Sequence, residues 1–213
     1  MIYRIAETTS TNDDAKRPEY RHGDIVWAER QTAGRGQRGH TWTSPEGENL
    51  TFSMVLEPRF LPVGEQFLLS EAVTLALTDT FAAYGIDTRI KWTNDIVLEG
   101  KKLCGILTEM GLENEINALQ YLVTGIGVNV NQRPEDFSPD VRPIAASLFN
   151  VLGRPVRRSE LAVQIIRALD RMYSAFPQGK ADYLARYRAD CLTPGNRVQL
   201  ITPASRTEAT ALS

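Results

Sequence analysis

Hydrophobic and polar residues alternate along several short stretches of the chain, and this alternation predicts β-strands. The clearest case is residues 49–57, where the even-numbered positions are apolar while Thr51 and Ser53 are polar. One face of this strand should therefore be buried and the other should carry polar groups. Further strands are expected at 2–7, 24–30, 89–92 and 119–131, in a hairpin over 96–111 that turns at Glu99–Gly100, and at 197–201 and 207–212.

Helical spacing of apolar residues appears in other parts of the chain. It predicts a helix over 64–84, which Gly85 is placed to end in the left-handed conformation. A brief helix should run to Lys16 with Ser10 or Thr11 as its N-cap, and two later helices are expected over 159–176 and 182–188. Because strands come first, helices follow and hairpins occur in the sheet, the order favours an α+β fold over a doubly wound parallel sheet.

Composition narrows the class of protein. A chain of 213 residues with 42% hydrophobic content can bury one sizeable core, so one main domain is expected. A net charge of -2 argues against a protein whose main task is binding nucleic acid. Two cysteines and two histidines favour neither a disulfide framework nor a His-rich metal site, and a reducing cytoplasm is the natural location. We expect no signal peptide and no membrane span, because no apolar run is long enough.

A glycine-rich segment over 34–39, GRGQRG, fits the dinucleotide pattern GxGxxG and, with His40 in place of lysine, nearly fits a P-loop. Both patterns require a helix directly after the glycines, whereas here a loop with proline and glycine leads to a strand. We therefore reject both. The exposed N–H groups, together with Arg35 and Arg38, can still bind an anion. The alternative interpretation is a solvated surface loop.

Four segments in chain order extend this picture. They are STN at 10–12, QTAGRGQRGHTW at 31–42, KWTNDI at 91–96 with KKLCGIL at 101–107, and GIGVN at 125–129. The series resembles the catalytic core of biotin–protein ligases, in which an STN element, a GRGRxG-type loop, a KWPND motif near KLxGIL, and a GxGxN strand occur in this order. The resemblance covers roughly residues 2–190, and its specific parts are the second and third segments.

This resemblance implies a mixed, largely antiparallel sheet with helices packed on it, similar to class II aminoacyl-tRNA synthetases. It implies a catalytic domain over 1–190 and, over 191–213, the abbreviated start of a small C-terminal β domain. The implied activity is ATP-dependent conversion of biotin to biotinyl-5′-AMP and transfer to a lysine of a biotin carboxyl carrier domain. The implied ligands are biotin, ATP and Mg²⁺, and no metal ion is expected to be fixed by the protein alone. The chain begins at the catalytic strand, so no DNA-binding role is expected, and the molecule should be a monomer or a homodimer.

Site residues follow from matching positions in the motifs. Lys102, Asp95 and Arg35 are the candidate catalytic residues. Lys102 should contact the biotin carboxylate and the acyl phosphate, Asp95 should orient the acceptor lysine or accept its proton, and Arg35 should help to shield the intermediate from water. The expected biotin-binding residues are Ser10, Thr11, Asn12, Gln31, Gly34, Arg35, Lys102, Gly105 and Gly125. The expected nucleotide-binding residues are Arg35, Gln37, Arg38, His40, Trp42, Lys91, Asn94 and Asn129.

Simpler roles compete with several of these assignments. Ser10 and Thr11 can merely cap a helix, Gly105 can mark a bulge, and Asp95 can cap a turn. The chain also departs from the family pattern, because Gln37 stands where many members have arginine and Thr93 stands in place of proline.

Two other functions remain as alternatives. A lipoate or octanoate ligase or transferase shares this architecture, but its RRxxGGG motif is absent from the sequence. The other is a binding regulator that kept the fold; Lys102 and Asp95 argue against it, since a sensor would not need both.

Overall fold

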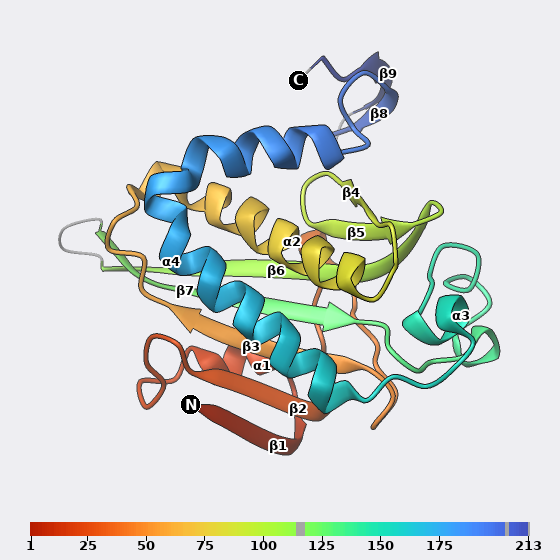
Figure 1. The fold of residues 1–213 in the computed structure, drawn as a ribbon, viewed down its shortest axis with the longest axis horizontal. Helices are drawn as coiled ribbons and strands as arrows, with labels where there is room; N and C mark the ends of the chain where they lie inside the picture. The colour runs from red at the N-terminus through yellow and green to blue at the C-terminus, as the bar shows by residue number, and fades with distance from the viewer. Residues whose placement is uncertain (114–117, 203–204, 213) are drawn as a thin grey trace.

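A mixed seven-stranded sheet forms the centre of the protein in the computed structural model, which describes residues 1–113, 118–202 and 205–212 (Figure 1). Its strand order is β1-β2-β3-β7-β6-β5-β4. The strands are β1 (Ile2–Thr8), β2 (Ile25–Gln31), β3 (Leu50–Leu56), β4 (Arg89–Lys91), β5 (Asp95–Leu98), β6 (Lys101–Glu113) and β7 (Ala118–Val128). Only β1 and β2 pair in parallel, and the other neighbours are antiparallel, which confirms the predicted α+β class.

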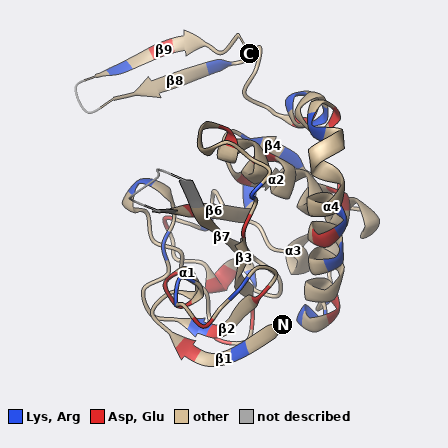
Figure 2. Cartoon of the chain, turned by 90° about the vertical axis from the view of Figure 1, so that its left-hand side faces the viewer, with Lys and Arg blue, Asp and Glu red and all other residues tan. Residues whose placement is uncertain are grey.

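Helices lie on both sides of this sheet. The helices are α1 (Thr11–Ala15), α2 (Gln66–Ala83), α3 (Leu148–Leu152) and α4 (Arg158–Asp190), with single 3-10 turns at Gln37–Gly39, Val63–Glu65 and Pro134–Asp136. Figure 2 shows α2 and α4 together on one side and α1 on the other. As predicted, Gly85 follows α2 with a positive φ of 76°, and Glu99 and Gly100 both have positive φ in the turn between β5 and β6.

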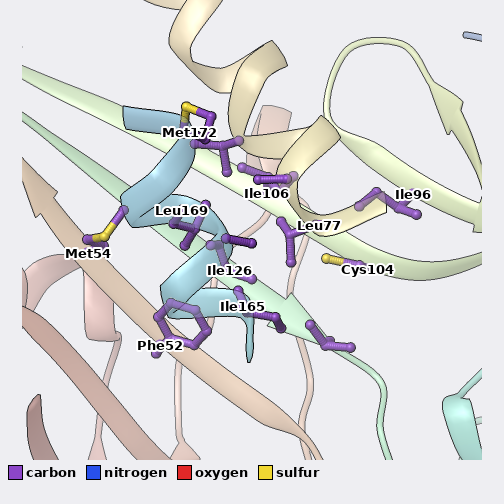
Figure 3. Close-up of a cluster of buried hydrophobic side chains, with 14 of the residues drawn as sticks. Phe52, Met54, Leu77, Ile96, Cys104, Ile106, Ile126, Ile165, Leu169 and Met172 are labelled. Carbon is purple, nitrogen blue, oxygen red and sulfur yellow. The ribbon is translucent and has the colours of Figure 1, made fainter. Parts of the chain in front are cut away.

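Alternation along three central strands divides the sheet into an apolar face and a polar face. On the apolar face Phe52, Ile106 and Ile126 are paired side by side across β3, β7 and β6. They pack against α2 and α4 through residues such as Leu77 and Leu169, and all five side chains are buried (Figure 3). This packing is the main core. The opposite face of the same strands carries Thr51, Ser53 and a set of glycines, so it is free to form a site.

The two helices expected over 159–176 and 182–188 are in fact one. Helix α4 continues through Pro177, and the prediction of a break there was wrong. Proline removes one N–H donor and pushes on the preceding turn, which bends a helix without ending it when packing continues on both sides. Phe176 before the proline and Tyr187 after it are both buried, and the ribbon changes direction part-way along (Figure 1).

The C-terminal residues form a separate two-stranded hairpin of β8 (Arg197–Ile201) and β9 (Arg206–Thr210). It follows a connection that is tied to the main sheet, since Leu192 N donates to Ile90 O at 2.8 Å and Trp92 N donates to Thr193 Oγ1 at 3.3 Å.

Among the helices that the structure describes, none combines the length and the apolar character needed to cross a bilayer.

Candidate active site

An open pocket lies on the polar face of the sheet, on the side away from α2 and α4. It joins all four motif segments found in the sequence. Predicted site residues that line it are Ser10, Thr11, Asn12, Gln31, Arg35, Gln37, Trp42, Asn94, Lys102, Gly105 and Gly125. Residues that the sequence did not single out as ligand-binding also line it: Gly36, Thr51, Ile106, Leu107, Ile126 and Gly127.

Three glycines on β6 and β7 leave room for the pocket and for the side chains around it. Gly105 pairs with Gly127, and Gly125 pairs with Leu107 and Ser53. A Cβ atom at Gly125 would overlap Asn12 Oδ1, and one at Gly127 would overlap the Trp42 indole. Neither backbone position has a positive φ. Glycine is therefore required here by close approach of neighbouring groups.

At one end of the pocket, polar side chains from three elements form a hydrogen-bonded chain. Thr11 donates to Gln31 Oε1 from its backbone N at 2.7 Å and from Oγ1 at 3.0 Å. Ser53 Oγ lies 2.7 Å from Thr11 Oγ1 and donates to Asn12 Oδ1 at 2.6 Å. All except Gln31 are buried. This arrangement supplies adjacent donors and acceptors in a sheltered place, which a cyclic urea or amide requires.

Ser10 occupies the N-cap position of α1, but its side chain makes no capping hydrogen bond. Its hydroxyl, which belongs to the pocket lining, is therefore not committed to the helix. Two further polar atoms of lining residues, Trp42 Nε1 and Thr51 Oγ1, are buried without a hydrogen-bond partner in the described part of the chain. Buried polar atoms are normally satisfied, so these atoms are consistent with a site built around a polar ligand.

Lys102 and Asp95 form an ion pair beside Gly105, two positions along β6 from Leu107, which pairs with the Gly125 that Asn12 contacts. The distance from Lys102 Nζ to Asp95 Oδ1 is 2.7 Å, and the ammonium lies 5.6 Å from the centre of the Trp42 ring. The backbone of Lys102 is fixed on both sides, because its N donates to Ile144 O at 2.7 Å and its O accepts from Ala146 N at 2.9 Å. The cation is thus held at a defined place beside the pocket floor.

The turn between β4 and β5 brings Asn94 into the pocket wall. Asn94 Nδ2 donates to Ile106 O, and Ile106 N donates back to Asn94 O at 3.0 Å. Thr93, which stands in place of the family's proline, donates to Asn94 Oδ1 at 2.9 Å and lies 3.4 Å from Gln37 Oε1. The Trp92–Thr93 peptide bond is cis. Tyr187 OH of α4 donates to Thr93 O at 2.6 Å, so the long helix supports this turn from behind.

The glycine-rich loop folds back on itself over the pocket. Trp42 N donates to Gly34 O at 2.9 Å, and Arg35 and Thr41 form an isolated β-bridge. Between them is the 3-10 turn at Gln37–Gly39, in which Arg38 takes a left-handed φ of 55°. No helix follows the glycines, as the sequence predicted. The Arg35 guanidinium donates to both oxygens of Asp13, each at 2.8 Å.

Six predicted site residues lie outside the pocket lining. Asp95 contacts the pocket through Lys102, and Gly34 packs beneath Trp42, where a Cβ atom would overlap the backbone. Asn129 is buried and donates to Ala146 O at 3.0 Å. The three remaining residues are exposed: Arg38, His40 and Lys91.

Charged residues that sequence reasoning missed stand behind the lining. Glu109 accepts hydrogen bonds from Asn12 Nδ2 at 2.7 Å and from Arg35, while Asp13 binds the same arginine. Glu109 could have been predicted, because side chains in a strand alternate between the two faces and Glu109 therefore shares the polar face of β6 with Gly105 and Leu107. Asp13 carried no such signal.

Within the described part of the chain, the site contains neither a cluster of metal ligands nor a reactive cysteine. Among the residues that the structure describes, no group of three or more His, Cys, Asp or Glu side chains is placed to hold a metal ion. Cys104 is buried on the apolar face, and burial raises the pKa of its thiol well above the ordinary value. The charged groups of the site are therefore lysine, arginine and carboxylates.

Fold and site together define a protein with a polar pocket, and a cation beside it, on the open face of a mixed sheet. A family model described as the Biotin/lipoate A/B protein ligase family matches residues 1–129. The biotin–[acetyl-CoA-carboxylase] ligase of Mycobacterium tuberculosis (strain H37Rv) is 32% identical over 210 residues, which cover 95% of this chain and 75% of that protein. The chain belongs to the biotin/lipoate protein ligase family.

Two further comparisons describe how far this likeness extends. The bifunctional ligase/repressor BirA of Bacillus subtilis is 36% identical over 176 residues, or 81% of this chain and 53% of that protein. The chain therefore spans about half the length of this relative. The structure of the biotin protein ligase from Aquifex aeolicus in complex with biotin and ATP superposes with a TM-score of 0.85 at 25% identity, covering 98% of this chain and 85% of that one.

Proposed function

We propose that the protein is a biotin–protein ligase, which activates biotin with ATP and transfers it to a lysine of a biotin carboxyl carrier domain. The observation that carries this proposal is the polarity of the pocket. A neutral hydrogen-bonding chain at Thr11 and Gln31 lies at one end, and the Lys102 ammonium lies at the other. Biotin has the same polarity, with a neutral ureido ring at one end and a carboxylate at the other.

In the first half-reaction an oxygen of the biotin carboxylate attacks the α-phosphorus of ATP, and pyrophosphate leaves. Two anions must approach each other, so a fixed cation at the meeting point lowers the barrier. Lys102 supplies that positive charge. Its backbone is fixed by two hydrogen bonds and its ammonium by the ion pair with Asp95, so little ordering is needed when the reaction occurs. The loop residues Arg35, Gln37 and Trp42 would close over the adenylate and exclude water.

In the second half-reaction the amine of the carrier lysine attacks the acyl carbon, AMP leaves, and the amine loses a proton. Asp95 is the carboxylate placed to orient that amine or to accept its proton. In the structure Asp95 is paired with the ammonium of Lys102. On its approach, the carrier lysine would take the place of Lys102 as the partner of Asp95.

Mg²⁺ is expected to arrive with ATP and to neutralise phosphate charge. Asn94 and Asn129 were both expected to bind the nucleotide, and the amide oxygen of either is of the kind that Mg²⁺ takes as a ligand. Of these, Asn94 lines the pocket and Asn129 does not, so Asn94 is the better candidate.

Biotin is favoured over lipoate because the Mycobacterium, Bacillus and Aquifex relatives are all named for biotin or for BirA, and the RRxxGGG motif is absent. The direct test is ATP–pyrophosphate exchange with either acid, followed by single-turnover transfer to a carrier domain. We expect exchange with biotin and none with lipoate. Exchange that depends on lipoate while biotin is inert would overturn the proposal.

Asp95→Asn should separate the two half-reactions. The amide keeps the shape but removes the proton acceptor, so we expect transfer from preformed adenylate to slow about 10²-fold. Adenylate formation should change little, because Lys102 retains its charge. Single-turnover measurements of each step decide this. Equal losses in both steps would show that Asp95 acts only by holding Lys102.

A further inference from the structure

Glu109 lies just behind the pocket, on the polar face of β6, and contacts three parts of the site at once. Its carboxylate accepts from Asn12 Nδ2 at 2.7 Å, from Lys16 Nζ at 3.0 Å and from Arg35 at 3.0 Å. Its side chain is 29% exposed, so these partners replace much of its hydration. Helix α1, the glycine-rich loop and the sheet therefore meet at this one carboxylate.

The first branch from Glu109 holds the glycine-rich loop. Arg35 donates to both oxygens of Asp13 at 2.8 Å and to Glu109 at 3.0 and 3.2 Å. The guanidinium is thus clamped between two carboxylates, one on α1 and one on β6. A planar guanidinium bound in this way is restrained in both position and orientation.

The second branch runs through Asn12 to the neutral end of the pocket. Asn12 Nδ2 donates to Glu109 and to Leu107 O at 3.2 Å, and both of these groups only accept. The amide oxygen must therefore face Ser53, which donates to it at 2.6 Å. Ser53 in turn contacts Thr11, so the orientation of the Asn12 amide sets the direction of the hydrogen-bonded chain.

The charge of Glu109 is stabilised by its surroundings. Burial raises the pKa of Glu109, but hydrogen bonds from Asn12 and Lys16 and the charges of Lys16 and Arg35 outweigh this effect and hold the pKa below its ordinary value. An ionised carboxylate cannot donate a hydrogen bond, so it accepts from all three neighbours.

We propose that Glu109 is a positioning residue that holds Arg35 over the pocket and, through Asn12, orients the hydrogen-bonded chain that meets the ureido end of biotin. The second part of this inference rests on the proposed function. The first part does not, because the clamp on Arg35 consists of protein groups alone.

Two substitutions at this position separate the branches. Glu109→Gln keeps an acceptor for Asn12 but removes the charge that binds Arg35, whereas Glu109→Ala removes both. Asp13→Asn weakens the clamp on Arg35 and a longer ion pair with Lys16 but leaves the contacts of Asn12 in place, and Ser53→Ala interrupts only the chain. Glu160→Gln is the matched control, since Glu160 forms an exposed ion pair with Arg157 on α4, across the sheet from the pocket.

The first measurement is hydrogen–deuterium exchange over residues 34–42 in the ligand-free protein. Loss of a half-exposed ion pair should speed exchange about fivefold in Glu109→Gln, Glu109→Ala and Asp13→Asn. The second measurement is the Kd for biotin by calorimetry. It should rise about fivefold in Glu109→Ala and Ser53→Ala, and by less than twofold in Glu109→Gln. Glu160→Gln should match the wild type in both.

Unchanged loop exchange in Glu109→Ala would overturn the clamp, and an unchanged biotin Kd in that variant would overturn the orienting role. Faster exchange spread equally over α2 and α4 would show a general loss of stability and would also overturn the proposal. If the wild type itself bound no biotin, the proposed function would fail, while loop exchange would still decide whether Glu109 holds Arg35.

Discussion

Replacing Lys102 with alanine is expected to lower biotin-dependent ATP–pyrophosphate exchange about 10³-fold, equivalent to ~4 kcal/mol of transition-state stabilisation. The reason is that the reaction joins two anions, and Lys102 is the lysine of the pocket lining. Its backbone is hydrogen-bonded to Ile144 and Ala146, so the alanine variant should keep the strand in place. Exchange of labelled pyrophosphate into ATP measures the effect.

The neighbouring lysine provides a matched control for this prediction. Lys101 belongs to the same hairpin and is exposed, so Lys101→Ala should change exchange by less than about twofold, the usual result for a surface charge. In Lys102→Ala the Asp95 carboxylate loses its ion-pair partner. The double variant Lys102→Ala/Asp95→Ala tests whether the loss of exchange arises from that unpaired carboxylate. If the double variant recovered exchange, the charge of Lys102 would not be what the reaction needs.

Gly125→Ala is expected to weaken biotin binding about 100-fold and to lower the free energy of unfolding by about 3 kcal/mol. The added Cβ atom would overlap Asn12 Oδ1. Asn12 would have to move, and its hydrogen bonds to Ser53, Glu109 and Leu107 O would be lost or distorted. Denaturant titration gives the stability, and calorimetry with biotin gives the affinity.

Gly64→Ala is the control, because a Cβ atom at Gly64 meets no atom within 4 Å and the backbone there does not have a positive φ. It should leave biotin affinity unchanged. An equal loss of affinity in both variants would mean that replacing any glycine weakens biotin binding, and that the contact with Asn12 is not the cause. Retention of affinity in Gly125→Ala would mean that Asn12 can move aside without cost.

Local patterns predicted most of the strands and helix α2, because the buried face of each element shows in the spacing of its apolar residues. The turn at Glu99–Gly100 and the end of α2 at Gly85 were predictable from their glycines, because few other residues readily adopt a positive φ. The break expected near Pro177 was wrong, because burial of Phe176 and Tyr187 on either side favours a bend over an end.

The site was predictable where a motif marked it and not where partners came from distant elements. Ser10, Gln31, Lys102 and Gly125 line the pocket as expected, although their roles as ligands remain predictions. The ion pair of Asp13 with Arg35 depends on how α1 lies against the loop, and nothing local encodes that. The support that Tyr187 gives to Thr93 from 94 positions away is likewise a product of the whole fold.

The division of β3, β6 and β7 into two faces has a practical consequence for protein engineering. Residues 51, 53, 105, 107, 125 and 127 face the pocket, while their sequence neighbours 52, 106 and 126 face the helices. In the first set Gly125 and Gly127 are required by close approach and Ser53 holds Asn12, so a combinatorial library restricted to positions 51 and 107 would explore new ligand shapes while the hydrophobic packing stays the same. In the second set Ile106 and Ile126 also line the pocket, so a library at Phe52, which belongs to the core and not to the lining, would tune thermal tolerance without altering selectivity. The chain thus carries two design variables interleaved residue by residue, and they can be optimised in separate rounds.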